Sequence, residues 1–398
     1  MQDARKSAAK RLEAMGLPQR RDEYWKYTRP DLLTAEKPAA AAIFKHGEGP
    51  MFAAIDRLKI VFVDGVYDAD LSDDLTLQGV KIWQLCDAPD WAQESYGKLE
   101  ETGQSPVPRP LATLNTAHAT EGVVIHATGE SCKPISLIYQ RKSETSDVMM
   151  HHIIKLDEGV SLTVLENGAA AARLNTVVEI DVADRAAFHH IRTMGRDHGR
   201  VAATHMFARL GAESTFKSFT MTMNGKLTRN EVVMELTGDN ATAHVAGVAM
   251  GDGEFVHDDT VFITHDAVNC ESRQVYKKVL RNGATGVFQG KILVQPDAQK
   301  TDGYQMSQSL LLDDNSQYYG KPELEIYADD VLCSHGSTTG AIDDEAMFYL
   351  RSRGVEVNEA QDLLILAFLA AAVDEIESEE IADHIRDRLA SWLTRRRK

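Results

Sequence analysis

The stretch HHIIKLDEGVSLTVLENGAAAARLNTVVEIDV, residues 151–182, carries the pattern that decides the fold. Three short runs within it, HHIIKL, VSLTVLE and TVVEIDV, alternate apolar with polar residues, and Gly159 marks a turn before the second run. Alternation with a period of two is typical of β-strands, whereas a helix would repeat its apolar residues every three to four positions. The stretch therefore predicts consecutive short strands.

The same pattern extends from Val123 to Val331, with further strand-like runs FARL, EVVMEL, VFITH, GVFQGKILV and LEIYADDV. Turn residues that precede such runs recur every 26 to 28 residues, at Gly159, Arg185, Ala212 and Asn240. A repeat of this length with strands in every period indicates a solenoid, in which each coil buries its inner face against its neighbours. We expect a β-helix, and a β-sandwich is the alternative that the pattern leaves open.

Helical patterns flank this β region. Residues 3–33 have apolar positions at helical spacing, and IVFVDGVYD from Ile60 predicts a β-hairpin across its Asp-Gly pair. Beyond Gly340 we expect helices with Asp343 and Ser378 as N-caps, an Asn358–Gln361 capping box and Gly354 at a helix C-terminus. The predicted regions are 1–50 (N-terminal helices), 51–122 (mixed connection), 123–340 (β core) and 341–398 (C-terminal helical domain).

Composition narrows the class of protein. The 398 residues carry a formal net charge of -17, which would repel a phosphate backbone, so nucleic-acid binding is not expected. The longest apolar run, Leu363–Val373, is shorter than the roughly twenty residues that span a bilayer. The charged N-terminus lacks the apolar stretch of a secretory signal. We therefore expect a cytoplasmic protein that does not enter membranes.

The four cysteines are scattered without a CxxC pair, at Cys86, Cys132, Cys270 and Cys333. This distribution indicates neither a disulfide framework nor a self-contained zinc site, and it fits a reducing compartment. Cys86 and Cys132 have no companion ligands nearby in the sequence, so we expect them to be buried as small apolar residues.

No sequence motif indicates catalysis. GATGVFQGK, residues 283–291, is not a phosphate loop, because that motif needs glycine where the chain has Thr285 and a Ser or Thr where it has Ile292. No nucleophile or zinc-protease signature occurs. The pairs His151-His152 and His189-His190 would point to opposite faces of a strand, so we expect surface or turn histidines. HDAVNCESRQ, from His265, is expected to form a structural turn. No catalytic residue is predicted.

The most informative segment is KPELEIYADDVLCSHGSTTG, residues 321–340. In an extended chain, Cys333 and His335 lie on one face about 7 Å apart. Thiolate is the usual ligand of iron–sulfur clusters, and imidazole can replace it. Two donors are too few for a cluster, so the pair predicts a metal site that another chain completes. The alternative is a buried cysteine beside a hydrogen-bonded histidine.

This segment resembles the SufB/SufD family, and the resemblance covers most of the chain. It includes HDAVNCESRQ, FQGKILVQPDAQKTDGYQ, SLLLDDNSQYYGKPELEIYADDVLCSHG and DDEAMFYLRSRG, and toward the N-terminus RRDEYWKYTRPDL, VFVDGVYDADLS and LATLNTAHATEGVVIHATG. The motif Cys333-Ser334-His335-Gly336 is similar to the SufD branch, since SufB chains have CEHE there and carry extra N-terminal cysteine motifs. Ser337 departs from the alanine that SufD chains generally have.

The resemblance implies a right-handed parallel β-helix between helical domains and a scaffold role in iron–sulfur cluster assembly. It implies partners SufB, through the end of the β-helix, and the ATPase SufC, through residues 341–398. It places His335 and Cys333 where a nascent cluster or iron binds at the interface with SufB, with no cofactor in the isolated chain. A homodimer could form without SufB. The alternatives are an autonomous iron–sulfur protein and a β-helix carbohydrate-active enzyme, which would require export.

Overall fold

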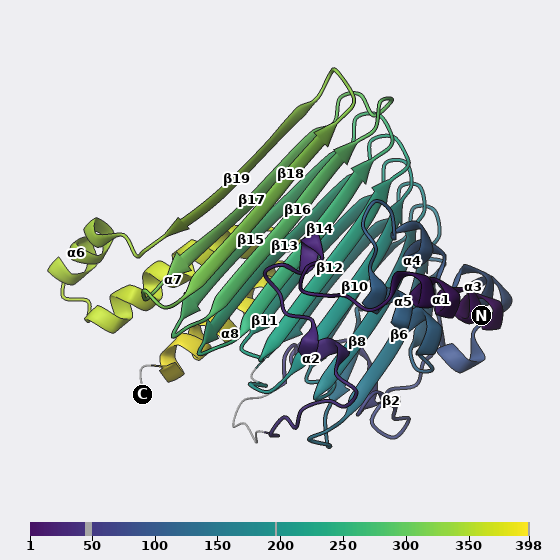
Figure 1. The fold of residues 1–398 in the computed structure, drawn as a ribbon, viewed down its shortest axis with the longest axis horizontal. Coiled ribbons are helices and arrows are strands. Elements are labelled where there is room, and N and C mark those ends of the chain that lie inside the picture. The colour runs from purple at the N-terminus through teal and green to yellow at the C-terminus, as the bar shows by residue number, and fades with distance from the viewer. Residues whose placement is uncertain (44–49, 196, 397–398) are drawn as a thin grey trace.

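The computed structural model describes residues 1–43, 50–195 and 197–396. Its strands wind as a two-sided solenoid with helices at both ends of the chain (Figure 1). The strands are β1 (Leu58–Val63), β2 (Val66–Tyr67), β3 (Val80–Gln84), β4 (Val123–Ala127), β5 (Ile135–Gln140), β6 (Asp147–Leu156), β7 (Ser161–Gly168), β8 (Arg173–Val182), β9 (Ala187–Met194), β10 (Val201–Leu210), β11 (Thr215–Met223), β12 (Leu227–Leu236), β13 (Thr242–Asp252), β14 (Val256–His265), β15 (Glu271–Arg281), β16 (Thr285–Val294), β17 (Asp302–Leu311), β18 (Gln317–Ile326) and β19 (Leu332–Gly340). The helices are α1 (Gln2–Met15), α2 (Asp31–Thr34), α3 (Asp90–Ser95), α4 (Lys98–Thr102), α5 (Pro110–His118), α6 (Asp344–Ser352), α7 (Val357–Val373) and α8 (Glu379–Arg396), with 3-10 turns η1 (Glu23–Trp25) and η2 (Leu85–Asp87).

Successive strands alternate between two sheets. Sheet A has the order β19-β17-β15-β13-β11-β9-β7-β5-β1-β2, and sheet B has the order β18-β16-β14-β12-β10-β8-β6-β4-β3. From β4 to β19 the neighbours within a sheet are parallel, and their paired residues lie 26 to 32 positions apart. The chain thus returns to the same sheet once per coil. This confirms the predicted solenoid and excludes the β-sandwich alternative.

The hairpin predicted at Ile60 is present, because β1 and β2 pair antiparallel with Val63 opposite Val66. β1 also pairs in parallel with β5, and β3 pairs antiparallel with β4, so this part of the chain begins both sheets. The division into regions 1–50, 51–122, 123–340 and 341–398 stays a prediction.

The coil interior holds an apolar core and, within it, a network of polar groups. Glu166 accepts hydrogen bonds from Arg192 Nε and Nη2 and from His190 Nε2, each at 3.0 Å, and from the Tyr139 hydroxyl at 3.2 Å. Burial opposes the ionisation of Glu166, but Arg192 and His190 outweigh it, so its pKa lies well below the usual value. Burial lowers the pKa of His152 to about 4, which keeps this ring neutral.

The expectation of surface or turn histidines at the two His-His pairs was wrong for three of the four residues, whereas His189 is partly exposed. His151, His152 and His190 are 0%, 0% and 2% exposed. His151 faces outward beneath the N-terminal helices, where its Nε2 lies 2.8 Å from Glu179, and His152 faces inward. Side chains on both faces of the strand are buried, because helices cover the outer faces of the sheets. Alternation within one strand does not reveal this cover.

The two helical ends cover opposite sheets. N-terminal residues Trp25, Leu33 and Leu111 pack on the outer face of sheet B in a cluster with Val201 and Leu227. The C-terminal helices α7 and α8 pack on the outer face of sheet A in a second cluster. Figure 1 shows α7 and α8 on the far side of the solenoid, and α7 contacts β13 and β15 there. No helix among the described residues has the length and apolar content to cross a membrane.

The predicted caps are confirmed except one. Asp343 accepts from the backbone N–H groups of Glu345 and Ala346, and Ser378 Oγ accepts from Ile381 N at 3.4 Å. The Asn358–Gln361 capping box was wrong, since α7 begins earlier and Glu356 accepts from the N–H of Asn358. A glutamate carboxylate two residues upstream therefore satisfies the free donors at this terminus.

The four cysteines are free thiols. Cys270 is buried, as a small apolar residue would be, but Cys86 and Cys132 are exposed, contrary to expectation. Cys86 lies in the surface turn η2, and Cys132 lies in the connection between β4 and β5. Loops of this kind run over the surface, where a short side chain has little to pack against.

Candidate functional site

The C-terminal end of the solenoid is open. β19 is the last strand of sheet A and pairs with β17, and β18 is the last strand of sheet B and pairs with β16. In the part of the chain that the structure describes, no strand covers the other edge of either one. Edge strands expose unpaired N–H and C=O groups, which favour pairing with another chain. Figure 1 shows both strands along one border of the molecule.

Cys333 and His335 both lie on β19 and face the inner side of this last coil. The register places Cys333 opposite Gly303 and His335 opposite Gln305, a residue of the coil interior. Cys333 is half-buried and packs beside Ile292, while His335 is exposed. The strand thus presents an imidazole at the open end with a thiol deeper on the same face.

The local environment keeps the thiol protonated. Burial raises the pKa of Cys333, and the Asp302 carboxylate adds to this, against a lowering by the backbone N–H of Gly303. A Cβ at Gly303 would lie 3.2 Å from Cys333 Sγ, so glycine leaves room for the sulfur. Binding of a metal by this sulfur would have to displace a proton.

Two donors do not make a complete metal site. Within residues 1–43, 50–195 and 197–396, no group of three or more His, Cys, Asp or Glu side chains lies close enough to hold a metal ion. The Cys333–His335 pair can therefore supply two ligands, and a cluster needs more.

The remaining motifs are structural. His265 Nε2 bonds Ser272 Oγ at 2.8 Å inside the solenoid, and Cys270 is buried beside it in the turn before β15. Residues 285–291 of the glycine-containing stretch form the start of β16 and no loop that could hold a phosphate. These segments shape the coils that lead to β19.

Sequence reasoning missed the residues that surround the site. Gln305 on β17 and Gln274 on β15 are in register behind His335. Two positions further along β17, Ser307 hydrogen-bonds the Tyr318 hydroxyl of β18. Their signal was the repeat itself, since Gln274, Gln305 and His335 are 31 and 30 residues apart. The turn residues show the length of the repeat, but they do not show which residues of successive strands share the inner face.

These features define a β-solenoid with an open end, where one thiol and one imidazole could act as metal donors. Residues 138–368 match the family model "SUF system FeS cluster assembly, SufBD core domain". The chain is 32% identical to the iron–sulfur cluster assembly protein SufD of Escherichia coli, over 95% of this chain and 90% of that protein. It is 28% identical to the SufBD family protein slr0076 of Synechocystis (96% and 89% covered) and 26% identical to SufD of Bacillus subtilis (62% and 58%).

The chain belongs to the SufB/SufD family, on its SufD side, and has a role in iron–sulfur cluster assembly by the SUF system. This membership agrees with the resemblance drawn from the sequence motifs. It leaves no observation in favour of a carbohydrate-active enzyme.

Proposed function

We propose that this chain is the scaffold subunit of a cytoplasmic complex with SufB and SufC, and that it contributes ligands to nascent cluster or iron binding at its contact with SufB. It holds partners together and performs no catalysis itself, and ATP hydrolysis belongs to SufC. The observation that carries the proposal is the exposed imidazole of His335 beside the half-buried Cys333 on an unpaired edge strand.

The open end supports pairing with SufB. Leu332 N donates to Thr301 O, so by the alternation of a parallel ladder the N–H groups of Cys333, His335 and Ser337 point to the free side of β19. A partner strand added there would satisfy these groups and bring its own ligands next to His335. Exposed apolar side chains at the tip of the coil, Tyr327 and Leu332, extend the same surface.

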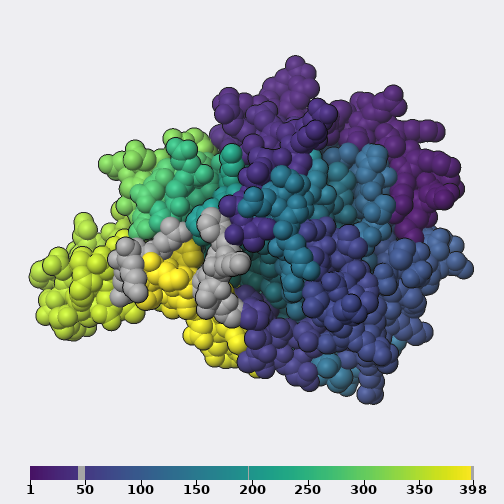
Figure 2. All heavy atoms as spheres, turned by 90° about the horizontal axis from the view of Figure 1, so that it is seen from below, coloured from purple at the N-terminus to yellow at the C-terminus, as the bar shows by residue number. Residues whose placement is uncertain are grey.

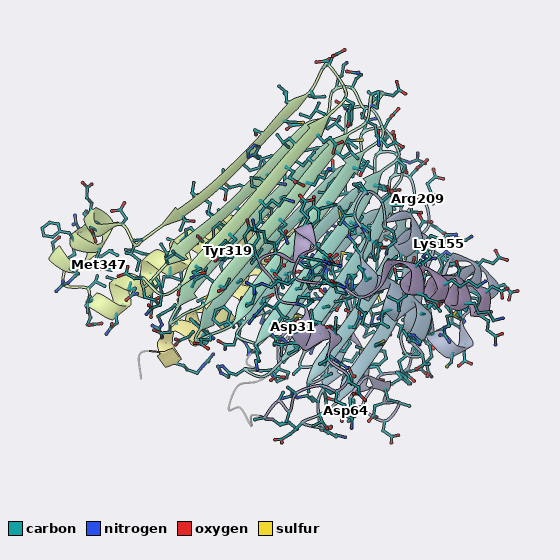
Figure 3. The ribbon with its side chains drawn as sticks, viewed as in Figure 1. Asp31, Asp64, Lys155, Arg209, Tyr319 and Met347 are labelled. Atoms are coloured by element: carbon teal, nitrogen blue, oxygen red, sulfur yellow. The ribbon has the colours of Figure 1, made fainter. Side chains whose placement is uncertain are left out.

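The C-terminal helices support contact with SufC. α6 has no buried residue, and Phe348 and Tyr349 are 74% and 54% exposed. Figure 2 shows residues of this part as a lobe that projects from the body, and Figure 3 places Met347 on it. Large apolar side chains exposed on a projecting helix are typical of a protein interface. The helices α7 and α8 join this lobe to sheet A.

Reconstitution of the three-subunit complex with His335→Ala tests the proposal. We expect the complex to assemble and the rate of cluster formation to fall at least tenfold, because a metal ligand is lost without change to the backbone pairing. Ser334→Ala is the matched control, since Ser334 is the exposed neighbour on the opposite face of β19. Cluster formation at the wild-type rate in the assembled His335→Ala complex would contradict the proposal.

An autonomous iron–sulfur protein is the second candidate. It would need at least two more ligands than the Cys333–His335 pair provides. A visible cluster chromophore in the anaerobically purified single chain, lost in Cys333→Ser, would favour it over the shared site.

A further inference from the structure

Gln305 lies directly behind His335 in the interior of the solenoid. It is the β17 residue in register with His335 of β19, and neighbouring strands lie about 4.8 Å apart. Gln305 is 0% exposed. Its side chain is therefore the polar group of the preceding coil that the imidazole of His335 meets first.

The orientation of the Gln305 carboxamide is fixed from below. Its Nε2 donates to Oε1 of Gln274, one coil further back, at 2.8 Å. Among the described residues, Gln305 Oε1 then has no hydrogen-bond donor. In a ladder of stacked amides each carbonyl faces the next strand, so this oxygen is directed to the β19 side. A buried carbonyl oxygen without a donor is destabilising, so a donor on β19 would stabilise the fold.

Sheet B, opposite Gln305, has a glycine where a side chain would clash with this carboxamide. A Cβ at Gly290 of β16 would lie 2.2 Å from Gln305 Nε2. Gly290 does not adopt a positive φ, so space alone favours glycine here: a Cβ would meet the Gln305 carboxamide and, at 2.8 Å, the Phe288 ring. Gln274 in the same sheet thus holds the amide in place, and Gly290 in the other sheet leaves room for it.

We infer that Gln305 is a positioning residue for His335. No donor reaches its Oε1 in this structure, and a turn of the His335 side chain toward the interior would bring one ring N–H to it; that hydrogen bond would fix the tautomer and leave the other ring nitrogen with a free lone pair directed to the open end. Histidines that bind metals commonly donate their second ring N–H to a carbonyl or carboxylate oxygen, which orients the ring and makes it a better ligand. This inference rests on the proposed role of His335 as a ligand.

The tautomer of His335 tests the inference in the isolated chain. With ¹⁵N-labelled histidine, the two ring nitrogens have distinct NMR shifts, and His335→Ala assigns the signal. We expect one tautomer to prevail about tenfold in the wild type, as one net hydrogen bond allows, and the ratio to approach unity in Gln305→Met. Gln289→Met is the matched control, because Gln289 is equally buried but bonds Tyr24 O on the outer face of sheet B.

Gly290→Ala keeps Gln305 but displaces its carboxamide, and it serves where Gln305→Met folds poorly. An unchanged ratio in either folded variant would overturn the inference, whatever His335→Ala does to cluster formation. In the complex with SufB, we expect Gln305→Met to weaken Fe(II) binding about 10- to 100-fold. Conversely, a changed tautomer ratio together with undiminished cluster formation in His335→Ala would refute the proposed function and leave the positioning contact standing.

Discussion

His152, His257 and His265 lie inside the coils, where burial lowers their pKa values to about 4, about 3 and about 4. In the unfolded chain each would titrate near 6.5. Between roughly pH 6.5 and 4 the unfolded state therefore binds protons that the folded state refuses, and stability falls as the pH falls. Glu166 affects stability at lower pH. Because its pKa is depressed in the folded state, its ionised form stabilises the fold above about pH 4.5, and this stabilisation is lost as the pH falls further.

Replacement of one interior histidine should flatten this dependence. We expect His152→Gln to reduce the slope of unfolding free energy against pH by about one proton near pH 5, or about 1.4 kcal/mol per pH unit. Urea denaturation at intervals from pH 5 to 7 measures it. Val148→Ala is the control, because loss of buried apolar volume lowers the free energy equally at every pH. Equal slopes in His152→Gln and the wild type would contradict the assignment of a neutral ring.

The candidate ligands could be found from the sequence, whereas their surroundings could not. Cys333 and His335 are two positions apart in one strand, and alternation alone puts them on one face. Gln305 meets His335 through coil register, and an offset of one residue would have turned it away from the interior. The burial of His151 was hidden as well, because the groups that contact it, the Tyr96 ring and Asn115, lie 55 and 36 residues away.

At the scale of elements, the N-terminal segment fastens the last strand of sheet B. Tyr24 donates to Glu323 at 2.6 Å, and Tyr27 stacks on Tyr319 with ring centroids 4.5 Å apart. Glu23 pairs with Lys321 at 2.7 Å. Figure 3 shows Tyr319 on β18 close to this segment. Residues that precede the first strand thus make three contacts with the last strand of sheet B.

Loss of the stacking contact should loosen β18 locally. We expect Tyr27→Ala to remove about 0.5–1.5 kcal/mol and to speed amide hydrogen exchange in Gln317–Ile326 about 2- to 10-fold. Tyr67→Ala removes a similar aromatic contact, with Phe62, at the other end of the solenoid and should leave these amides unchanged. Exchange in β18 that is the same in both variants would show that the segment does not hold the strand.

Strands and caps were predictable where a local pattern sufficed. The hairpin at β1 and β2 follows from Asp64-Gly65, and Asp343 caps α6 because its carboxylate faces the free N–H groups. The start of α7 was misplaced, since an Asn and a Glu both supply acceptors and the sequence does not rank them. Propensity locates an element but not the residue at which it begins.

At the scale of the whole molecule, the regular spacing of turn residues was enough to predict the architecture. Each coil repeats the same pair of strands, so turn spacing predicted a solenoid before any contact was known. Which helices cover which sheet was not predictable, because those contacts join distant residues. The ion pair of Lys217 on sheet A with Glu377 beyond α7 spans 160 positions. Such contacts carry no local signal, although they bury the outer face of sheet A.

A pair of proline variants on β19 tests whether the open end is the site of association. Ser337 and Thr338 are adjacent, but by strand alternation the N–H of Ser337 faces the free edge and that of Thr338 faces β17. We expect Ser337→Pro to keep the melting temperature and to abolish association with SufB, or self-association where SufB is absent, because proline removes a donor on the free edge. Thr338→Pro instead breaks the β17 ladder and should cost about 1–2 kcal/mol of stability.

Thermal unfolding and sedimentation equilibrium separate the two effects in the full-length chain. The preceding residue at position 336 is glycine, so proline at 337 imposes little strain on the backbone before it. If Ser337→Pro binds SufB as tightly as the wild type while its fold is intact, partner pairing does not use the edge of β19. The ligand set proposed to include His335 and Cys333 would then have to be completed from another direction, because the proposed partner contact and the proposed metal site share this one strand.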